Sequence, residues 1–144
     1  MGLVFADFSL SNPKEAGSSP LTVRALVDTG ALMLCIPPAI AAALNLRELE
    51  RREVTLADGG KHQVPYVGPV QVSFAGRNCF TGAFVLGLEV LIGAIPLEDM
   101  DLVISPATRQ VVVNPLSPNI PSAILTQAQP PRNIRYAGFS VSSL

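Results

Sequence analysis

The sequence predicts a single all-β domain of many short strands, with one or two short helices. Short runs of apolar and β-branched residues recur along the chain, and clusters of Gly, Pro, Asn, Asp and Ser separate them. The dipeptide Asp58-Gly59 lies between two such runs and is a strong signal for a β-hairpin. The 144 residues, 49% of them apolar, suffice for one hydrophobic core but not for two.

The first part of the chain alternates strands with turns. Strands are expected at Leu3–Leu10 and Leu21–Val27, because both runs are apolar and a Pro- and Gly-containing turn cluster at 12–20 separates them. A further apolar strand is expected at Leu32–Ile36. An Ala-rich helix should then run from Pro38 to Leu46, since proline is well placed in the first helical turn.

A hairpin is expected in the middle of the chain. Its strands are Glu53–Ala57 and Lys61–Val67, and Asp58-Gly59-Gly60 joins them. Asp and Gly both tolerate positive φ, which favours a type I′ turn. The preceding charge run Glu48–Arg52 indicates a solvated connection after the helix.

The remaining elements follow from the same patterns. One helical turn is expected at Pro96–Asp101, and further strands are expected at Val70–Phe74, Asn78–Leu86, Glu89–Ile92, Leu102–Ile104 and Gln110–Val113. Beyond Asn114, five prolines alternate with Ser, Asn and Gln. We therefore predict a folded domain over residues 1–114 and an extended or disordered tail over 115–144, able to pack on a partner.

Composition restricts the possible partners and location. The net charge is −1 and tryptophan is absent, so the chain has no electrostatic footprint for nucleic acid. No membrane segment is expected, because Pro37-Pro38 interrupts the longest apolar stretch. The first residues lack the basic start of a signal peptide. Cys35 and Cys79 lie in apolar settings, which favours reduced thiols in a cytoplasmic protein, with a disulfide as the alternative.

Most catalytic chemistries lack their residues. His62 is the only histidine, and no Gly-x-Ser-x-Gly motif accompanies it, so a Ser-His or Cys-His centre is disfavoured. Cys and His do not occur in pairs at metal-ligand spacing, and Gly59-Gly60 is too short for a phosphate loop. We therefore expect neither a metal nor a cofactor.

The segment Leu26-Val27-Asp28-Thr29-Gly30-Ala31 is the strongest chemical signal. An apolar strand delivers one carboxylate to its end, and Gly30 permits a sharp turn or a close backbone approach. Asp28 could alternatively cap an ordinary turn, because Asp side chains often bond nearby amides. The tripeptide alone leaves both interpretations open. A short internal echo, Leu91-Ile92-Gly93-Ala94, also runs from an apolar strand into Gly-Ala.

With the hairpin at Asp58-Gly59-Gly60 between them, these two segments resemble the retropepsin-like aspartic proteases, the single-lobed relatives of pepsin. The first is similar to the catalytic loop of that family, the hairpin to its flap, and Leu91-Ile92-Gly93 to the segment crossing behind the loop. The resemblance covers about residues 3–113. Leu32-Met33 and Ala94 depart from the acidic residues and the arginine of viral members, which favours the non-viral bacterial branch.

The resemblance implies a small closed barrel of the acid-protease type and a role for each residue of the motifs. Asp28 would be catalytic, with Thr29 and Gly30 supporting its loop. The substrate would contact three apolar residues and the flap tip: Leu26, Ala31, Ile92, Asp58, Gly59 and Gly60. The mechanism needs two carboxylates, so the second would be Asp28 of another subunit in a homodimer acting on a polypeptide substrate. A non-catalytic peptide-binding or assembly module on the same fold is the alternative.

Overall fold

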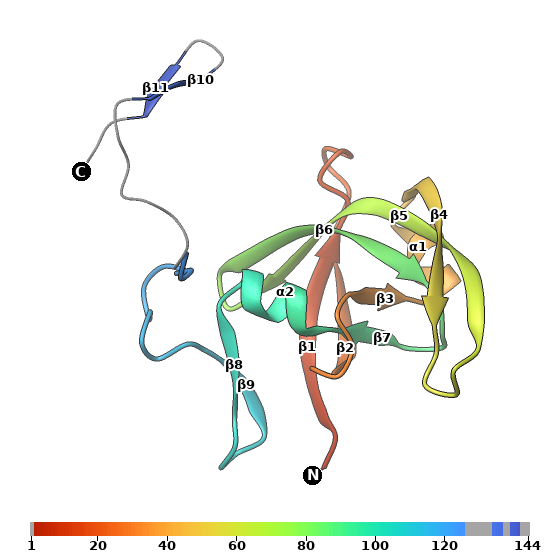
Figure 1. Ribbon diagram of the computed structural model, residues 1–144, viewed down its shortest axis with the longest axis horizontal. Helices are drawn as coiled ribbons and strands as arrows, with labels where there is room; N and C mark the ends of the chain where they lie inside the picture. The colour runs from red at the N-terminus through yellow and green to blue at the C-terminus, as the bar shows by residue number, and fades with distance from the viewer. Residues whose placement is uncertain (1, 126–133, 137–138, 142–144) are drawn as a thin grey trace.

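One sheet closes on itself to form the body of the protein (Figure 1). The computed structural model describes residues 2–125, 134–136 and 139–141. The strands of this sheet are β1 Val4–Ser11, β2 Leu21–Val27, β3 Leu34–Ile36, β4 Arg47–Thr55, β5 Lys61–Phe74, β6 Arg77–Val85 and β7 Val90–Ile92. Their order is β1-β2-β7-β3-β6-β5-β4, and β1 also pairs with β5. Six strands therefore close a barrel and β4 lies outside it, which confirms the predicted small closed all-β barrel.

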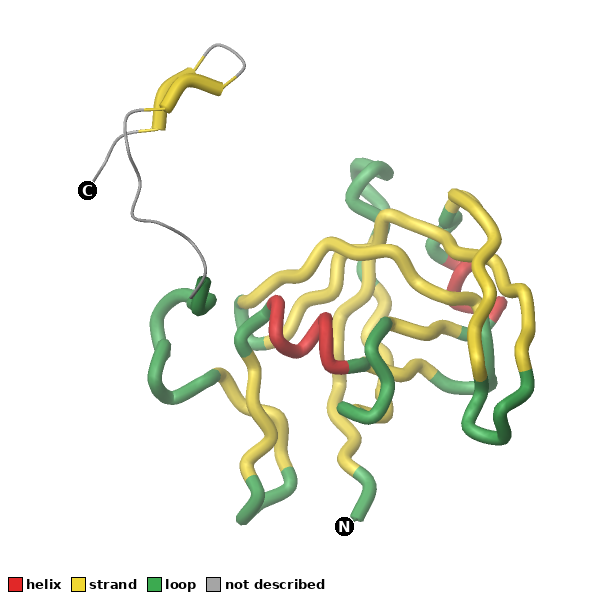
Figure 2. The backbone as a smooth tube through the Cα atoms, in the orientation of Figure 1, coloured by secondary structure: helices red, strands yellow, loops and turns green. Residues whose placement is uncertain are grey.

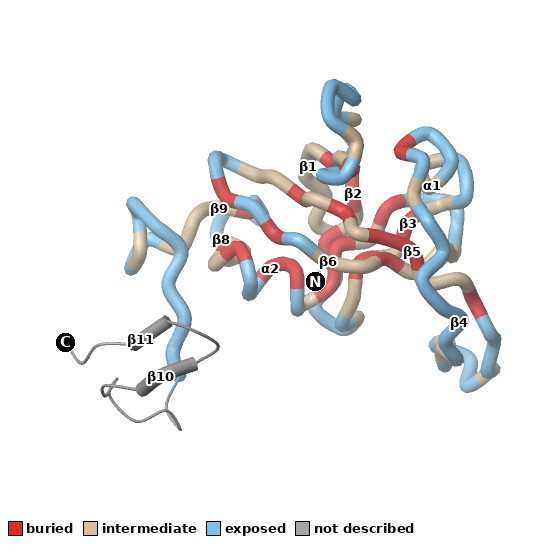
Figure 3. Tube along the Cα trace, turned by 90° about the horizontal axis from the view of Figure 1, so that it is seen from above, coloured by how far each residue is buried: buried red, intermediate tan, exposed pale blue. Residues whose placement is uncertain are grey.

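The core fills the inside of this barrel. Side chains alternate between the two faces of each strand, so Ala25 and Val27 of β2 are buried while Leu26 between them is half-exposed. In Figure 3 the buried positions gather in the barrel strands, whereas β4 is exposed along almost its whole length. The largest fully buried side chains are apolar: Phe8, Leu10, Leu34, Ile36, Val70, Val72, Cys79, Ile92, Pro96 and Met100.

Strands β2 and β7 lie side by side in parallel, with Leu26 opposite Leu91 and Val27 opposite Ile92. The two segments that echo each other in the sequence are therefore direct neighbours. Both leave the sheet at the same edge, because parallel strands end on the same side. This pairing brings Gly93 next to the loop that follows β2.

The hairpin of β4 and β5 forms where Asp58-Gly59 predicts it, but its turn is not of type I′. The Leu56 carbonyl accepts from Gly59 N–H (2.9 Å), and Leu56 N–H donates to the Gly60 carbonyl (2.8 Å). Gly59 has a φ of +83°, and it is the one residue of this turn with a positive φ. A three-residue loop of residues 57–59 results, with a left-handed Gly at its end, which is the usual alternative to the two-residue loop.

Both strands of this hairpin are longer than predicted. The charge run Glu48–Arg52 is not a connection but part of β4, although its side chains are exposed as expected. Backbone pairing with β5 overrides the weak strand propensity of Glu and Arg. Strand β5 continues from Lys61 to Phe74 through an irregularity around Pro69, because β6 supplies pairing partners on both sides of it.

Two short helices accompany the described strands (Figure 2). The first, α1 Pro38–Ala43, begins at the predicted proline and ends three residues before Leu46. The second, α2 Ala94–Asp99, begins two residues earlier than predicted, so Pro96 lies in its first turn, where proline is tolerated. Within residues 2–125, neither helix is long enough to cross a membrane.

A separate hairpin, β8 Leu102–Ser105 with β9 Gln110–Val113, follows α2. A polar network then attaches the next segment to the barrel. Arg77 of β6 is 4% exposed, and its guanidinium donates to the carbonyl oxygens of Asp101 (3.1 Å) and Ser117. The Asp101 carboxylate accepts from the Asn114 amide (2.9 Å), the Ser122 N–H (2.9 Å) and the Ser117 hydroxyl. These contacts reach beyond residue 114, so the proposed domain boundary there stays a prediction.

Within the predicted tail, β10 Ile134–Tyr136 pairs antiparallel with β11 Phe139–Val141. Residues 126–133, 137–138 and 142–144 of that tail lie outside the described residues. The expectation of an extended or disordered tail over 115–144 stays a prediction.

Candidate active site

Asp28 follows the last residue of β2, and three hydrogen bonds fix the loop around it. Its N–H donates to the Ile92 carbonyl (3.0 Å), and its own carbonyl accepts from Ala31 N–H (3.2 Å). The Oδ1 atom of its carboxylate accepts from Gly30 N–H (2.9 Å). Asp28 therefore does cap a turn, as in the alternative interpretation of the sequence. However, it uses only one carboxylate oxygen, and Asp28, Thr29 and Gly30 are all exposed on the single chain.

Gly93 holds this loop from behind. A Cβ atom at Gly93 would lie 2.5 Å from the carbonyl carbon of Leu32 and 2.5 Å from the carbonyl oxygen of Met33. Only a residue without a side chain can therefore cross here. The crossing is closed by Ala94 N–H, which donates to the Ala31 carbonyl (2.9 Å), and by Ile95 N–H, which donates to the Leu32 carbonyl (2.9 Å).

The predicted substrate residues occupy different environments. Ala31 is half-buried in the Asp28 loop, and Leu26 is half-buried on β2. Ile92, in contrast, is 0% exposed and packs inside the barrel, so its side chain is not on a surface that a substrate could touch. Ile92 contacts Asp28 through its backbone carbonyl, which accepts the hydrogen bond from Asp28 N–H. The residue beside it, Leu91, is the half-exposed one.

The sheet register defines a row of side chains, of which the sequence predicts only Leu26 as a substrate contact. Leu26 lies opposite Leu91, Leu91 opposite Cys35, Cys35 opposite Phe84, and Phe84 opposite Tyr66. Directly opposed residues share one face of a sheet, and all five are half-buried. Asp28 is two positions after Leu26 and continues the alternation of that face. Burial alternation in each strand could have indicated these residues, but only the strand order shows that they adjoin.

The hairpin tip repeats the turn chemistry of the Asp28 loop. The Oδ1 atom of Asp58 accepts from Gly60 N–H (2.8 Å), in the same way that Oδ1 of Asp28 accepts from Gly30 N–H. Asp58 and Gly59 are exposed and Gly60 is half-buried, so all three are accessible at the tip. His62, on the adjoining strand, is exposed.

The two cysteines are free, and neither is poised for nucleophilic chemistry. Burial raises the pKa of the Cys79 thiol to about 12, with a further contribution from Asp99. Burial also raises the pKa of Cys35, which lies in the half-buried row. Both thiols are therefore neutral near pH 7.

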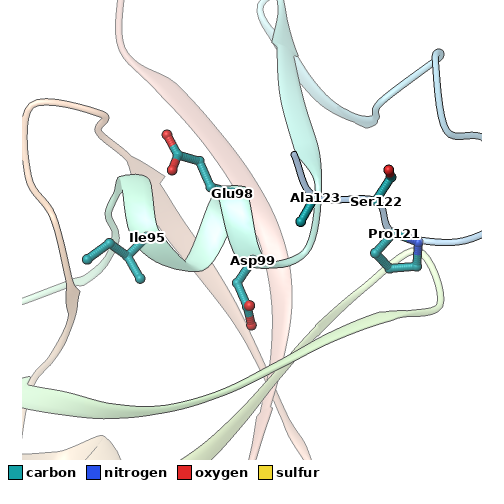
Figure 4. A pocket seen from close by; sticks show the side chains of 6 residues that line it. All are labelled: Ile95, Glu98, Asp99, Pro121, Ser122 and Ala123. Carbon is teal, nitrogen blue, oxygen red and sulfur yellow. The ribbon is translucent and has the colours of Figure 1, made fainter. Parts of the chain in front are cut away.

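A shallow pocket of about 390 Å³ lies away from Asp28 (Figure 4). The side chains of Ile95, Glu98 and Asp99 on α2 form one side, and residues 121–123 form the other. The Asp28 loop contributes nothing to its lining. Among the described residues, no group of three or more His, Cys, Asp or Glu side chains could hold a metal ion.

Comparisons with known proteins agree with this geometry. Residues 16–120 match the aspartyl protease family, so the chain belongs to that family. Among solved structures, it resembles the retroviral protease-like domain of Ddi1 from Leishmania major, with a TM-score of 0.56 and 12% identity over 100% of this chain and 95% of that one. This likeness shows the fold, which is retropepsin-like. No curated protein matches the chain. The predicted family is confirmed, and the bacterial branch stays a prediction.

Proposed function

We propose that this protein is a homodimeric aspartic endopeptidase whose two Asp28 carboxylates, one from each subunit, activate the attacking water. The observation that carries the proposal is the fixed Asp28 loop. The carboxylate is exposed, one of its oxygens is held by Gly30 N–H (2.9 Å), and its backbone is anchored to Ile92 (3.0 Å). Such anchoring is what a catalytic group needs, because its geometry is set before the substrate arrives.

The chemistry requires a second carboxylate close to the first. Two carboxylates about 3 Å apart cannot both ionise, so they share one proton, and one acts as base while the other acts as acid. The base removes a proton from water, which attacks the peptide carbonyl, and the acid donates to the carbonyl oxygen. A two-fold axis places the same residue opposite itself, so one Asp28 per chain is enough.

Other residues then have supporting roles. Thr29 is exposed at the loop, where its hydroxyl can bond to the backbone of the partner's loop. The β4–β5 hairpin would act as a flap that closes over an extended peptide and excludes water, with Asp58, Gly59 and Gly60 at its tip. Leu26, Ala31 and Leu91 would contact apolar substrate side chains near the scissile bond.

A binding module is the second candidate. The exposed edge strand β4, which pairs only with β5 among the described residues, could hold a peptide by strand addition without cleaving it. The two functions differ in their need for Asp28, because a pure binder does not depend on facing carboxylates.

Cleavage of a peptide library from acidic to neutral pH separates the two candidates. Wild type, Asp28→Asn and the control Asp7→Asn are compared; Asp7 is an exposed carboxylate on β1, outside the proposed site. We expect wild type and Asp7→Asn to cleave alike, and Asp28→Asn to lose at least about a thousandfold in kcat while still binding peptide. Equal cleavage by Asp28→Asn would reject the protease, and peptide binding without cleavage by wild type would favour the module.

A further inference from the structure

We propose that Arg52 on the β4–β5 hairpin determines specificity by binding an acidic side chain of the substrate, at a position within about six residues of the scissile bond. This inference rests on the proposed peptide-binding cleft, but its test does not require cleavage.

The row leads from Asp28 to Tyr66 along one face of the sheet. Four strand spacings separate Leu26 on β2 from Tyr66 on β5. At about 4.8 Å for each spacing, the path along the curved sheet is about 19 Å. An extended peptide covers about 3.4 Å per residue, so Tyr66 is within about six residues of the scissile bond. The side chains beside Asp28 in this row are apolar, so the row itself offers no charged contact near the scissile bond.

Tyr66 forms a fixed platform at that end. Its ring centroid lies 5.3 Å from that of Phe84 on β6. Its ring also covers Gly82, where a Cβ atom would lie 2.1 Å from the ring. The absence of a side chain at Gly82 thus lets the ring lie directly against β6. A ring packed on two sides keeps one orientation, and it presents its remaining face to the hairpin.

Arg52 stacks on this platform. Its guanidinium carbon lies 3.8 Å from the centroid of the Tyr66 ring. Its Nε–H donates to the Glu50 carboxylate (2.7 Å). This bond uses one of the five N–H donors of the Arg52 guanidinium. The Arg52 side chain is still 42% exposed. The guanidinium is therefore held in orientation by a ring and a carboxylate and remains accessible to a ligand.

The face of the hairpin that carries Arg52 is the one turned toward the row. Arg52 lies opposite Val64, and Val54 lies opposite His62. Val64 is buried and Val54 is half-buried, whereas Glu53 and Gln63, which point to the other face, are exposed. A substrate lying along the row would meet Arg52 on this face.

A carboxylate is the ligand that matches this group. A guanidinium is planar, and its parallel N–H groups bind a carboxylate in a bidentate manner. A basic substrate side chain would have to displace Arg52 from Glu50 and would meet the positive charge of Arg52. Because the pair is partly exposed, we expect a preference of about fivefold rather than a stringent requirement, as is usual for solvated ion pairs.

Peptide binding to the Asp28→Asn background tests the proposal without cleavage. Fluorescence anisotropy compares peptides carrying Glu, Gln or Lys at each of positions three to six from the centre of an apolar core sequence. The expected result is about fivefold tighter binding of one Glu peptide over its Gln counterpart, lost in Arg52→Gln and reversed in favour of Lys in Arg52→Glu. The matched variant Glu50→Gln, which frees the guanidinium, should increase the preference for Glu.

Each other outcome overturns the proposal. Equal binding of Glu and Gln peptides by the protein with Arg52 intact would do so, and so would a Lys preference that disappears in Glu50→Gln. Absence of binding by every peptide would also overturn it. Wild-type cleavage of the same peptides is scored separately, so tight but uncleaved peptides would reject the protease while leaving the role of Arg52 supported.

Discussion

Replacement of Gly93 by Ala tests the crossing behind the Asp28 loop. The added Cβ would lie 2.5 Å from two backbone atoms of Leu32 and Met33 and 2.6 Å from a third, the Met33 nitrogen. Ordinary Cβ contacts begin at 3.4 Å, so the shortfall is about 0.9 Å and the opposing atoms cannot rotate away. Overpacking in a core costs about 1–3 kcal/mol, and a backbone clash falls at the upper end or above it. We expect a loss of about 3 kcal/mol, which lowers Tm by about 10 °C for a chain of this length.

Thermal melting followed by circular dichroism gives the Tm of Gly93→Ala, and its kcat for peptide cleavage reports the effect on the Asp28 loop. A loop displaced by about 1 Å should also lose about a hundredfold in kcat. Gly76→Ala is the control, because its Cβ meets nothing within 4 Å and adds only the strain of a φ of +79°, about 1–2 kcal/mol. If Gly93→Ala melts no lower than Gly76→Ala, the backbone does not cross as closely as described and the reasoning is refuted.

Two further predictions concern titrating groups. Hydrogen bonds from Ser117 and Asn114 lower the pKa of Asp101 from 3.8 to about 2, so its contribution to stability is complete above pH 3.8 and is lost as the pH falls toward 2. The Tm difference between wild type and Asp101→Asn should shrink over that window; a constant difference would contradict the assignment. Because burial raises the pKa of Cys79 to about 12, iodoacetamide at pH 8 should leave Cys79 unmodified in the folded protein and alkylate half-buried Cys35 slowly. Mass spectrometry checks this, and equal labelling of both thiols would contradict it.

The sequence predicts the fold well where its local strand and turn signals agree with the strand pairing in the structure. An apolar run that follows a turn cluster predicts β2 to the residue, and Asp58-Gly59 predicts the position of the hairpin. The conformation of the Asp28 loop is predictable as well, since Asp28 and Gly30 form the turn that their chemistry favours. Local chemistry decides these features.

Features set by distant partners could not be predicted. Glu48–Arg52 has only a weak strand propensity of its own and becomes a strand because β5 pairs with it. Ile92 and Leu91 are equally apolar, and only the strand register shows that Leu91, rather than Ile92, faces the side of Asp28. The stacking of Arg52 on Tyr66 joins residues of two strands and has no local signal.

The central claim is that each chain carries half of the active site. Coexpression of wild type and Asp28→Asn with different affinity tags, followed by purification through both tags, yields the mixed dimer. Its kcat measured on a cleaved peptide tests the claim directly. We predict residual activity of about a thousandth of wild type or less, because one carboxylate cannot act as both acid and base. A mixed dimer with half of the wild-type activity would show that each subunit works alone and would contradict the claim.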